Sequence, residues 1–344
     1  MAYTDIDKPS DYFNTKLYSG NASTQSITGV GFQPDFTWIK QRNGTGWHQW
    51  VDAVRGSGKR INSNDTGAEY NDVNGLTSFD TDGFSLGTSG DYNGSGNTQV
   101  SWNWLASNTT ASNTDGSITS TVSANTTSGF SIVSYTGTGS NATVGHGLGV
   151  VPKMIIVKLR SGAGDWTVYN SNIGNTNFLR LNGTLASTSQ ATYWNNTTPT
   201  SSVFSVGSAG DVNTSSGTHI AYCFAEKKGF SKFGSYTGND NADGPFIYTG
   251  FKPAFTILKR TDSADNWLMQ DNKRKNPFNV VDTQLFPDLN NAESSSSAIL
   301  DYCSNGFKIR KTGGNINASG GSYIYMAFAE QPLVGTNNIP ATAR

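Results

Sequence analysis

The residues best suited to catalysis are sparse in this chain and form no recognisable constellation. Only three histidines occur, His48, His146 and His219. They occupy unrelated positions in the internal repeats described below, so a shared metal site or catalytic triad would require convergence from different repeats. His146 lies in a glycine-rich turn, but no Gly-Lys-Ser/Thr motif accompanies it, which excludes a phosphate-binding loop. We therefore expect no catalytic residue and no metal site.

Calcium-binding and redox chemistry have little support either. The turns 80–83 and 240–244 resemble fragments of calcium loops, yet neither has the full ladder of oxygen ligands or the terminal glutamate. We interpret both as tight turns. The two cysteines, Cys223 and Cys303, fall at non-matching positions of different repeats, which indicates neither a disulfide framework nor a zinc site. Cys223 is expected to be a buried free thiol, and the sequence predicts no cofactor.

Carboxylates could support glycoside hydrolysis only as a pair about 5–10 Å apart. Asp52, Asp271, Glu226 and Glu330 are the available candidates. Glu226 and Glu330 end matching strands of two repeats, where the remaining repeat has Ala106. A residue that two repeats share and the third lacks favours a structural role.

Aromatic side chains are better candidates for binding, because an exposed ring can stack on a sugar while neighbouring amides bind its hydroxyl groups. Tyr193, Trp194, Asn195 and Asn196 occur together in one repeat only, within a polar stretch. We predict that these four residues form a ligand-binding loop. A second set of tryptophans recurs in every repeat, which favours a core role while leaving sugar stacking open. That set is Trp47, Trp166 and Trp267.

The elements that must position these residues come from a unit of about one hundred residues, repeated three times. Each copy contains a Gly-x-x-Pro motif, then alternating apolar residues, then a lysine six residues after the proline, and finally a closing aromatic strand. Such self-similarity indicates a repeat architecture. The prolines are Pro34, Pro152 and Pro253, the first apolar residues are Phe36, Met154 and Phe255, and the lysines are Lys40, Lys158 and Lys259.

These patterns fit short β-strands. Proline cannot donate to a strand ladder and so favours a strand's first residue, whereas the lysine should end the strand with its ammonium in water. Asn-Gly and Asp-Gly turns break the chain at short intervals, which is typical of sandwiches and barrels. The first apolar residue of each copy should occupy an equivalent core site.

We therefore predict an all-β fold of three tandem related β-sandwich modules, similar to jelly rolls. The short second junction should make repeats two and three a rigid pair, whereas the linker should give repeat one more freedom. The predicted boundaries are an N-terminal arm at 1–11, repeats at 12–106, 129–226 and 229–330, a Ser/Thr/Asn-rich linker carrying one strand at 107–128, and a C-terminal tail at 331–344.

The composition restricts the possible partners. Charged residues make up 14% of the chain, against roughly 25% in an average protein, and the net charge is −1. No global field favours nucleic acid, and no apolar run has the length of a membrane span. The abundant Gly, Ser, Thr and Asn suit either a neutral surface facing the extracellular medium or simply the many turns of a β protein. The N-terminus has no signal-peptide pattern, so we expect synthesis in a cytoplasm without secretion.

Four motifs carry a family resemblance across nearly the whole chain. They are similar to uncharacterised virion proteins of tailed phages, many from marine bacteria and cyanobacteria. Such proteins are commonly labelled tail-fibre or structural proteins. The resemblance brings no established functional residue. The motifs lie at 12–21, 31–34, 144–149 and 323–330.

The resemblance implies a virion protein that is assembled in the host cytoplasm and exposed on the particle exterior. We expect a non-enzymatic tail-fibre or receptor-binding component that contacts host-surface glycans. The alternatives are a capsid-exterior decoration or tail adaptor without a ligand, and, third, a glycan-degrading enzyme. The expected partners are other virion proteins, further copies of the chain (a trimer is favoured) and a host glycan, with no nucleic acid and no membrane insertion.

Overall fold

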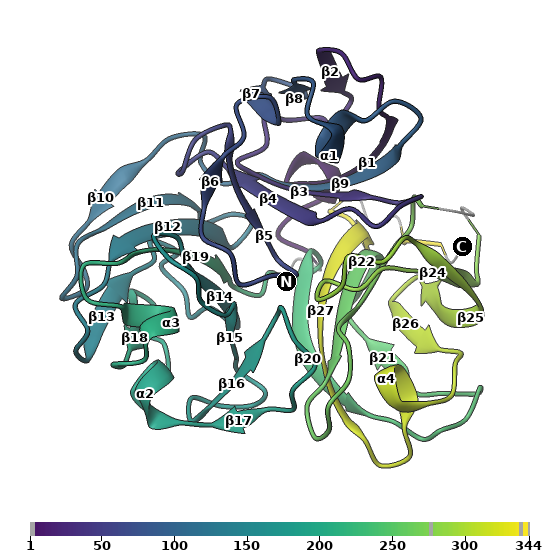
Figure 1. Ribbon diagram of the computed structural model, residues 1–344. Coiled ribbons are helices and arrows are strands. Elements are labelled where there is room, and N and C mark those ends of the chain that lie inside the picture. The colour runs from purple at the N-terminus through teal and green to yellow at the C-terminus, as the bar shows by residue number, and fades with distance from the viewer. Residues whose placement is uncertain (1–3, 275–277, 337–339, 343–344) are drawn as a thin grey trace.

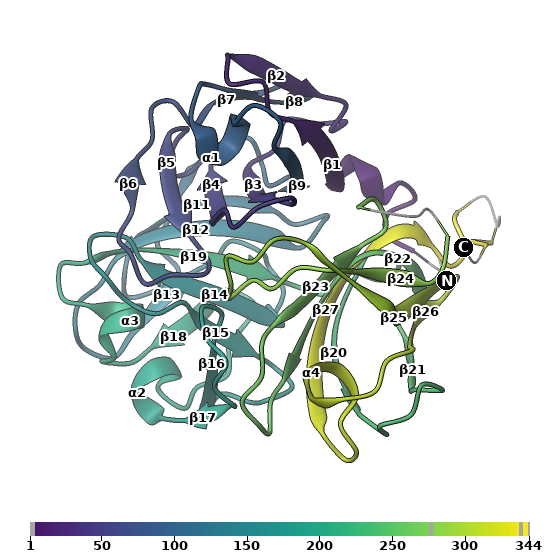
Figure 2. The ribbon, with the colours of Figure 1, turned by 45° about the vertical axis from the view of Figure 1, so that its right-hand side comes forward.

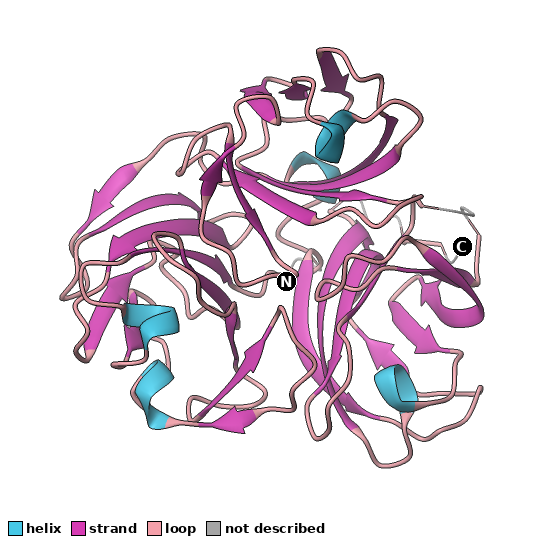
Figure 3. Ribbon diagram, viewed as in Figure 1, coloured by secondary structure: helices cyan, strands magenta, loops and turns pink. Residues whose placement is uncertain are grey.

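A computed structural model describes residues 4–274, 278–336 and 340–342. Strands dominate this part of the chain, and its helices are single short turns (Figure 3). The protein is therefore all-β, as predicted. Its strands form several separate sheets, and in the described residues none of them closes into a barrel. Three consecutive segments of the chain each contribute one inner sheet and one outer sheet.

Segment 1 follows the short 3-10 helix η1 (Pro9–Asp11) and contains the helix α1 (Gly90–Asn93). Its inner sheet has the order β1 (Phe13–Ser19), β9 (Thr98–Trp104), β3 (Phe36–Gln41), β4 (His48–Asp52), β5 (Lys59–Asn62) and β6 (Tyr70–Asn71). Its outer sheet has the order β2 (Gln25–Thr28), β8 (Gly83–Leu86) and β7 (Leu76–Asp80).

Segment 2 contains the helices α2 (Ala191–Trp194) and α3 (Gly210–Asn213). Its inner sheet has the order β10 (Ala111–Asn113), β11 (Ser120–Asn125), β12 (Phe130–Thr136), β19 (Thr218–Phe224), β14 (Met154–Leu159), β15 (Thr167–Asn170), β16 (Asn177–Arg180) and β17 (Thr188–Ser189). Its outer sheet pairs β13 (Ala142–Gly145) with β18 (Val203–Val206).

Segment 3 contains the helix α4 (Gly314–Asn317). Its inner sheet has the order β20 (Ser231–Thr237), β27 (Ser322–Pro332), β22 (Phe251–Arg260) and β23 (Leu268–Asp271). Its outer sheet has the order β21 (Phe246–Tyr248), β26 (Gly306–Ile309), β25 (Ser294–Cys303) and β24 (Val281–Gln284).

The three segments lie around a common centre (Figures 1 and 2). One hydrophobic cluster at that centre takes buried residues from all three inner sheets. Phe36, Met154 and Phe255 lie in it and pair with the closing aromatic residues of their own sheets, so the predicted equivalence of these core sites is confirmed. Three further clusters lie between the inner and outer sheets, one in each segment.

The shared centre corrects the expected freedom of repeat one. The rings of Phe36 and Tyr222 are 4.7 Å apart across segments 1 and 2, and those of Phe13 and Phe255 are 5.4 Å apart across segments 1 and 3. Segment 1 is therefore packed as closely as its neighbours. The predicted linker, 107–128, carries two strands rather than one, and both extend the inner sheet of segment 2.

Parts of the predicted arm and tail also pack on the body. Ile6 is buried in the central cluster, and the backbone N–H of Asp5 donates to the carbonyl of Lys228. The backbone N–H of Thr336, in the predicted tail, donates to the carboxylate of Asp7 at 2.7 Å. Residues 1–3, 337–339 and 343–344 of the predicted arm and tail lie outside the described residues.

Candidate functional site

Neighbouring segments meet at three junctions, which we call 1–2, 2–3 and 3–1 after the segments that they join. The same backbone hydrogen bond crosses each of them. Its acceptor always lies two residues after the lysine shared by the repeats. The bonds are Glu69 N–H to the Arg160 carbonyl at 2.9 Å, Ser187 N–H to the Thr261 carbonyl at 2.8 Å, and Glu293 N–H to the Arg42 carbonyl at 2.7 Å.

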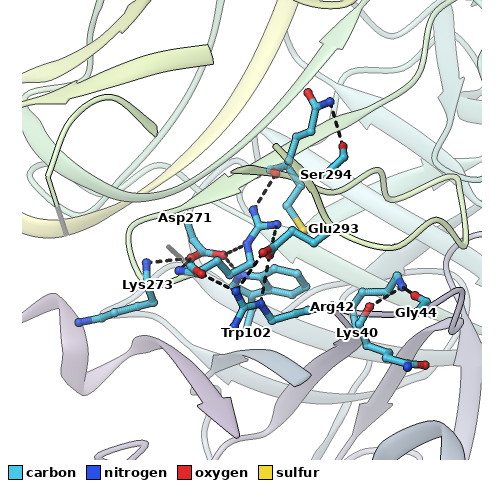
Figure 4. Close-up of polar contacts among 12 residues, drawn as sticks. Lys40, Arg42, Gly44, Trp102, Asp271, Lys273, Glu293 and Ser294 are labelled. Carbon is cyan, nitrogen blue, oxygen red and sulfur yellow. Dashed lines mark hydrogen bonds and ion pairs between the residues drawn. The ribbon is translucent and has the colours of Figure 1, made fainter. Parts of the chain in front are cut away.

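Junction 3–1 contains a buried charge network (Figure 4). The Arg274 guanidinium pairs with the Asp271 carboxylate at 2.6 Å, and both side chains are fully buried. The indole N–H of Trp102, from the neighbouring segment, donates to the same carboxylate at 3.0 Å. Glu293 accepts from Arg42 at 2.9 Å and lies 3.4 Å from Arg274. Charge-assisted bonds therefore link segments 3 and 1.

Junction 1–2 repeats this network with equivalent residues. Arg55 pairs with Asp52 at 2.5 Å, again with both side chains fully buried. The Tyr222 hydroxyl donates to Asp52 at 2.7 Å, and burial raises the pKa of Tyr222 well above its usual value. Glu69 bridges Arg55 and Arg160 at 3.3 and 2.9 Å. Asp52 and Asp271 are thus committed to internal partners and present no free oxygen to a substrate.

Junction 2–3 has lost these charges. Asn170 and Ile173 stand where the other two junctions have the aspartate and arginine, and Met326 replaces the donor aromatic. Ser187 and Thr261 take the places of the glutamate and its second arginine. The three junctions therefore share a backbone connection but differ in polarity.

The three lysines that the repeats share are buried, which corrects the expectation that their ammonium groups reach water. Lys158 donates to the carbonyls of Gly164 and Thr66, and Lys259 donates to those of Asp265 and Thr184. Thr66 and Thr184 belong to the preceding segment, so these ammonium groups bridge junctions. Lys40 instead donates to two carbonyls near its own strand. Burial lowers the pKa of each lysine to about 8.

The four predicted ligand-binding residues separate into two buried rings and two exposed amides. Trp194, 2% exposed, and Tyr193, 5% exposed, lie on α2 within the cluster between the sheets of segment 2. The Tyr193 ring stacks on Phe178 with 3.8 Å between centroids. The expectation that the Tyr193 and Trp194 rings are exposed is therefore wrong, because the helical turn α2 directs both side chains into the core. Asn195 and Asn196 are exposed, and their ligand contact stays a prediction.

The recurring tryptophans favour the core interpretation, with one correction. Trp166 and Trp267 are buried and donate their indole N–H groups across junctions, to the carbonyls of Asn62 and Arg180. Trp47 is 38% exposed, and His48 takes the equivalent position instead. Counting back four residues from the end of β4, β15 and β23, rather than forward from the lysine, would have aligned His48 with the two tryptophans.

The remaining candidates from the sequence bond to other residues of the chain. His146 is buried, and its ring bonds to the Thr200 carbonyl and the Leu148 N–H. Asp82 accepts the N–H groups of Gly29 and Gly31, which lie in the loop between β2 and β3. Glu226 pairs with Lys232 at 2.7 Å, and Glu330 accepts from Asn272 at 2.7 Å. Cys223 is buried, as predicted.

Within 4–274, 278–336 and 340–342 no three His, Cys, Asp or Glu side chains gather as a metal site. No helix in the same ranges has the length and apolarity needed to cross a membrane.

A pocket lies at junction 2–3, away from the Asn170 and Ile173 positions that lack the charge network. Its volume is about 560 Å³, which falls in the range typical of ligand sites. Segment 2 contributes Lys153 and Glu226, segment 3 contributes Lys232 and Tyr248, and Asp5 of the arm lies at its edge. The pocket therefore joins ammonium groups, carboxylates and an exposed aromatic ring.

The match to known families covers all three segments. A family model described as a domain of unknown function, DUF7483, matches residues 8–332, from η1 to the end of β27. No curated protein and no solved structure matches the chain. By this match the chain belongs to the DUF7483 family.

Proposed function

We propose that this chain is a non-enzymatic phage virion protein on the particle exterior, acting as a tail-fibre or receptor-binding component that contacts host-surface glycans. The observation that carries the proposal is the use of buried charges. The carboxylates and arginines at two junctions hold segments together rather than facing a cleft. This use of charge suits a rigid scaffold.

We interpret the three segments as three related, jelly-roll-like β-sandwich modules. A contact that recurs three times supports this interpretation. The last residue of α1, α3 and α4 is a buried asparagine whose amide donates to a carbonyl six residues before it. Its side-chain oxygen accepts an N–H from the loop that follows β1, β12 or β20. These residues are Asn93, Asn213 and Asn317.

A shared core makes the three modules one body, which suits an attachment protein that transmits force without unfolding. The partners we propose are other virion proteins, further copies of this chain in a trimer, and a host glycan. Weak single-site binding would then be multiplied by the number of copies on one particle.

The position and copy number of the chain in an intact particle test this proposal. We expect cryo-electron microscopy to locate it at the tail, and particles that lack it to adsorb poorly to host cells. Normal adsorption of such particles, with many copies on the capsid lattice, would instead establish the decoration alternative. Release of reducing sugar from host glycans by the purified protein would establish the enzyme alternative.

A further inference from the structure

The pocket at junction 2–3 exists because this junction is less filled than the other two. The residue after the motif proline is Asp35 in segment 1, Lys153 in segment 2 and Ala254 in segment 3. At junction 1–2, the Asp35 carboxylate accepts the backbone N–H groups of Ala106 and Asn108, so the linker occupies the space. At junction 3–1, the corresponding pocket, lined by Ala254, measures only about 70 Å³.

The charges in the larger pocket are unevenly satisfied. Glu226 and Lys232 form an ion pair with each other. Lys153 is half-buried, and its ammonium makes no hydrogen bond or ion pair with any residue in the described part of the chain. An unpaired ammonium beside a satisfied pair is suited to receive an anionic group.

Tyr248 adds a surface for stacking. It lies on β21, lines the pocket and is 58% exposed. Rings of this kind present an apolar face to a ligand while their hydroxyl stays in water. The Glu226–Lys232 pair lies in the same pocket and offers both acceptors and donors for hydroxyl groups.

We propose that this pocket binds a carboxylate-bearing sugar, with its carboxylate on Lys153 and its ring against Tyr248. This inference rests on the proposed glycan contact and specifies its ligand class and site. It also moves the expected contact away from Trp194, whose ring is buried.

Titration of the purified full chain with sodium glucuronate, glucose and acetate, followed by ligand-observed NMR, tests the assignment. We expect saturable glucuronate binding at least about tenfold tighter than that of glucose or acetate, because a charge-assisted bond contributes about one such factor. Lys153→Ala should lose this advantage, and Tyr248→Ala should lose binding of both sugars.

Two matched variants serve as controls. Phe246→Ala removes a ring that is 47% exposed on the same strand but does not line the pocket, and Lys273→Ala removes a lysine that lines the smaller pocket. Both should bind glucuronate as the unmodified protein does. Equal glucuronate and glucose affinity, acetate binding as tight as glucuronate binding, or an unaffected Lys153→Ala variant would each overturn the proposal.

The particle assay separates this site from the proposed function. If adsorption requires the protein but the titration fails, the acidic-sugar site is wrong and the attachment role stands. If the titration succeeds but particles lacking the protein adsorb normally, the site stands and the attachment role is wrong.

Discussion

Asp52 and Asp271 show what a buried carboxylate does in this protein. Each is fully enclosed, paired with an arginine three residues later, and bonded to an aromatic donor of the adjacent segment. Removing two charges from water costs about as much as their attraction returns, so such a pair adds little net stability. The pair instead fixes geometry, because the carboxylate oxygen that receives the guanidinium also accepts the aromatic donor and so determines where the neighbouring segment can dock.

The neutral junction suggests how to test that interpretation. Arg274→Ile alone leaves the Asp271 carboxylate buried without its cation, and we expect a loss of about 3–5 kcal/mol in the free energy of unfolding. The double variant Asp271→Asn, Arg274→Ile reproduces the Asn170 and Ile173 pair of segment 2 and should recover most of that loss. Urea unfolding measures both. A double variant no more stable than the single one would show that the pair itself holds the junction.

Phe255 tests the central core at one side chain. It is fully buried and its ring lies within 6 Å of those of Phe13, Trp102 and Trp104. Phe255→Ala removes a large side chain from a site that three segments enclose, and we expect a loss of about 3–5 kcal/mol in denaturant unfolding. Phe246→Ala, at an exposed position, is the control. A cost below 1 kcal/mol at Phe255 would mean that the core can collapse around the vacancy.

At the scale of elements, one turn recurs where β1, β12 and β20 end. A tyrosine there donates its hydroxyl to the carbonyl of the penultimate residue of the helical turn: Tyr18 to Tyr92, Tyr135 to Val212 and Tyr236 to Ile316. The glycine two residues later packs directly against the end of that helix. The sequence shows the Tyr-Ser/Thr-Gly motif, and the structure shows that its glycine is required by a close approach of backbones.

Gly137→Ala tests that requirement. A Cβ at this position would lie 2.4 Å from the carbonyl oxygen of Thr214, so either strand β12 or helix α3 must shift. We expect a loss of roughly 1–3 kcal/mol in stability, as for other overpacked sites. Gly183→Ala is the matched control, because its nearest atom would be 3.9 Å away. Equal stability of the two variants would contradict the packing argument.

The core positions of the strands were more predictable from the sequence than the contacts that cover individual side chains. The prediction that the motif proline is the first residue of each strand is wrong, because Pro34 and Pro152 precede β3 and β14 whereas Pro253 lies inside β22. The core positions of Phe36, Met154 and Phe255 do follow from local alternation. The burial of Trp194 and of Lys158 does not, because it depends on what packs above them. Lys158 is covered partly by the carbonyl of Thr66, which belongs to a different segment. A single sequence without coordinates gives no access to that contact.

At the scale of the whole molecule, three segments share one core and three junctions. Long-range contacts of this kind make the folding of each segment dependent on its neighbours. The bridging lysines add to that dependence, because Lys158 and Lys259 each bind a carbonyl of another segment. Proton release by the three lysines should therefore change the free energy of unfolding of the entire chain.

The pH dependence of the free energy of unfolding tests the role of these three lysines. Burial lowers the pKa of Lys40, Lys158 and Lys259 to about 8 in the folded state, whereas the ordinary value is 10.5. Between these values the unfolded chain binds protons that the folded chain has released. The free energy of unfolding should therefore rise with pH from about 8 to 9, by up to about 1.4 kcal/mol for each lysine, and this gain should be lost as pH falls through 8.

Urea unfolding at pH 7, 8 and 9 measures this slope. The window ends at 9 because the two cysteine thiols, whose pKa desolvation raises, oppose the effect at higher pH. Replacing all three lysines by methionine should flatten the profile, since an unbranched apolar side chain fills a similar space without a proton to lose. Lys273→Met, at an exposed position, should keep the slope of the unmodified chain. A flat profile in the unmodified chain would mean that the carbonyl acceptors stabilise the ammonium groups fully, and that the three lysines hold the junctions together as cations at every pH in the window.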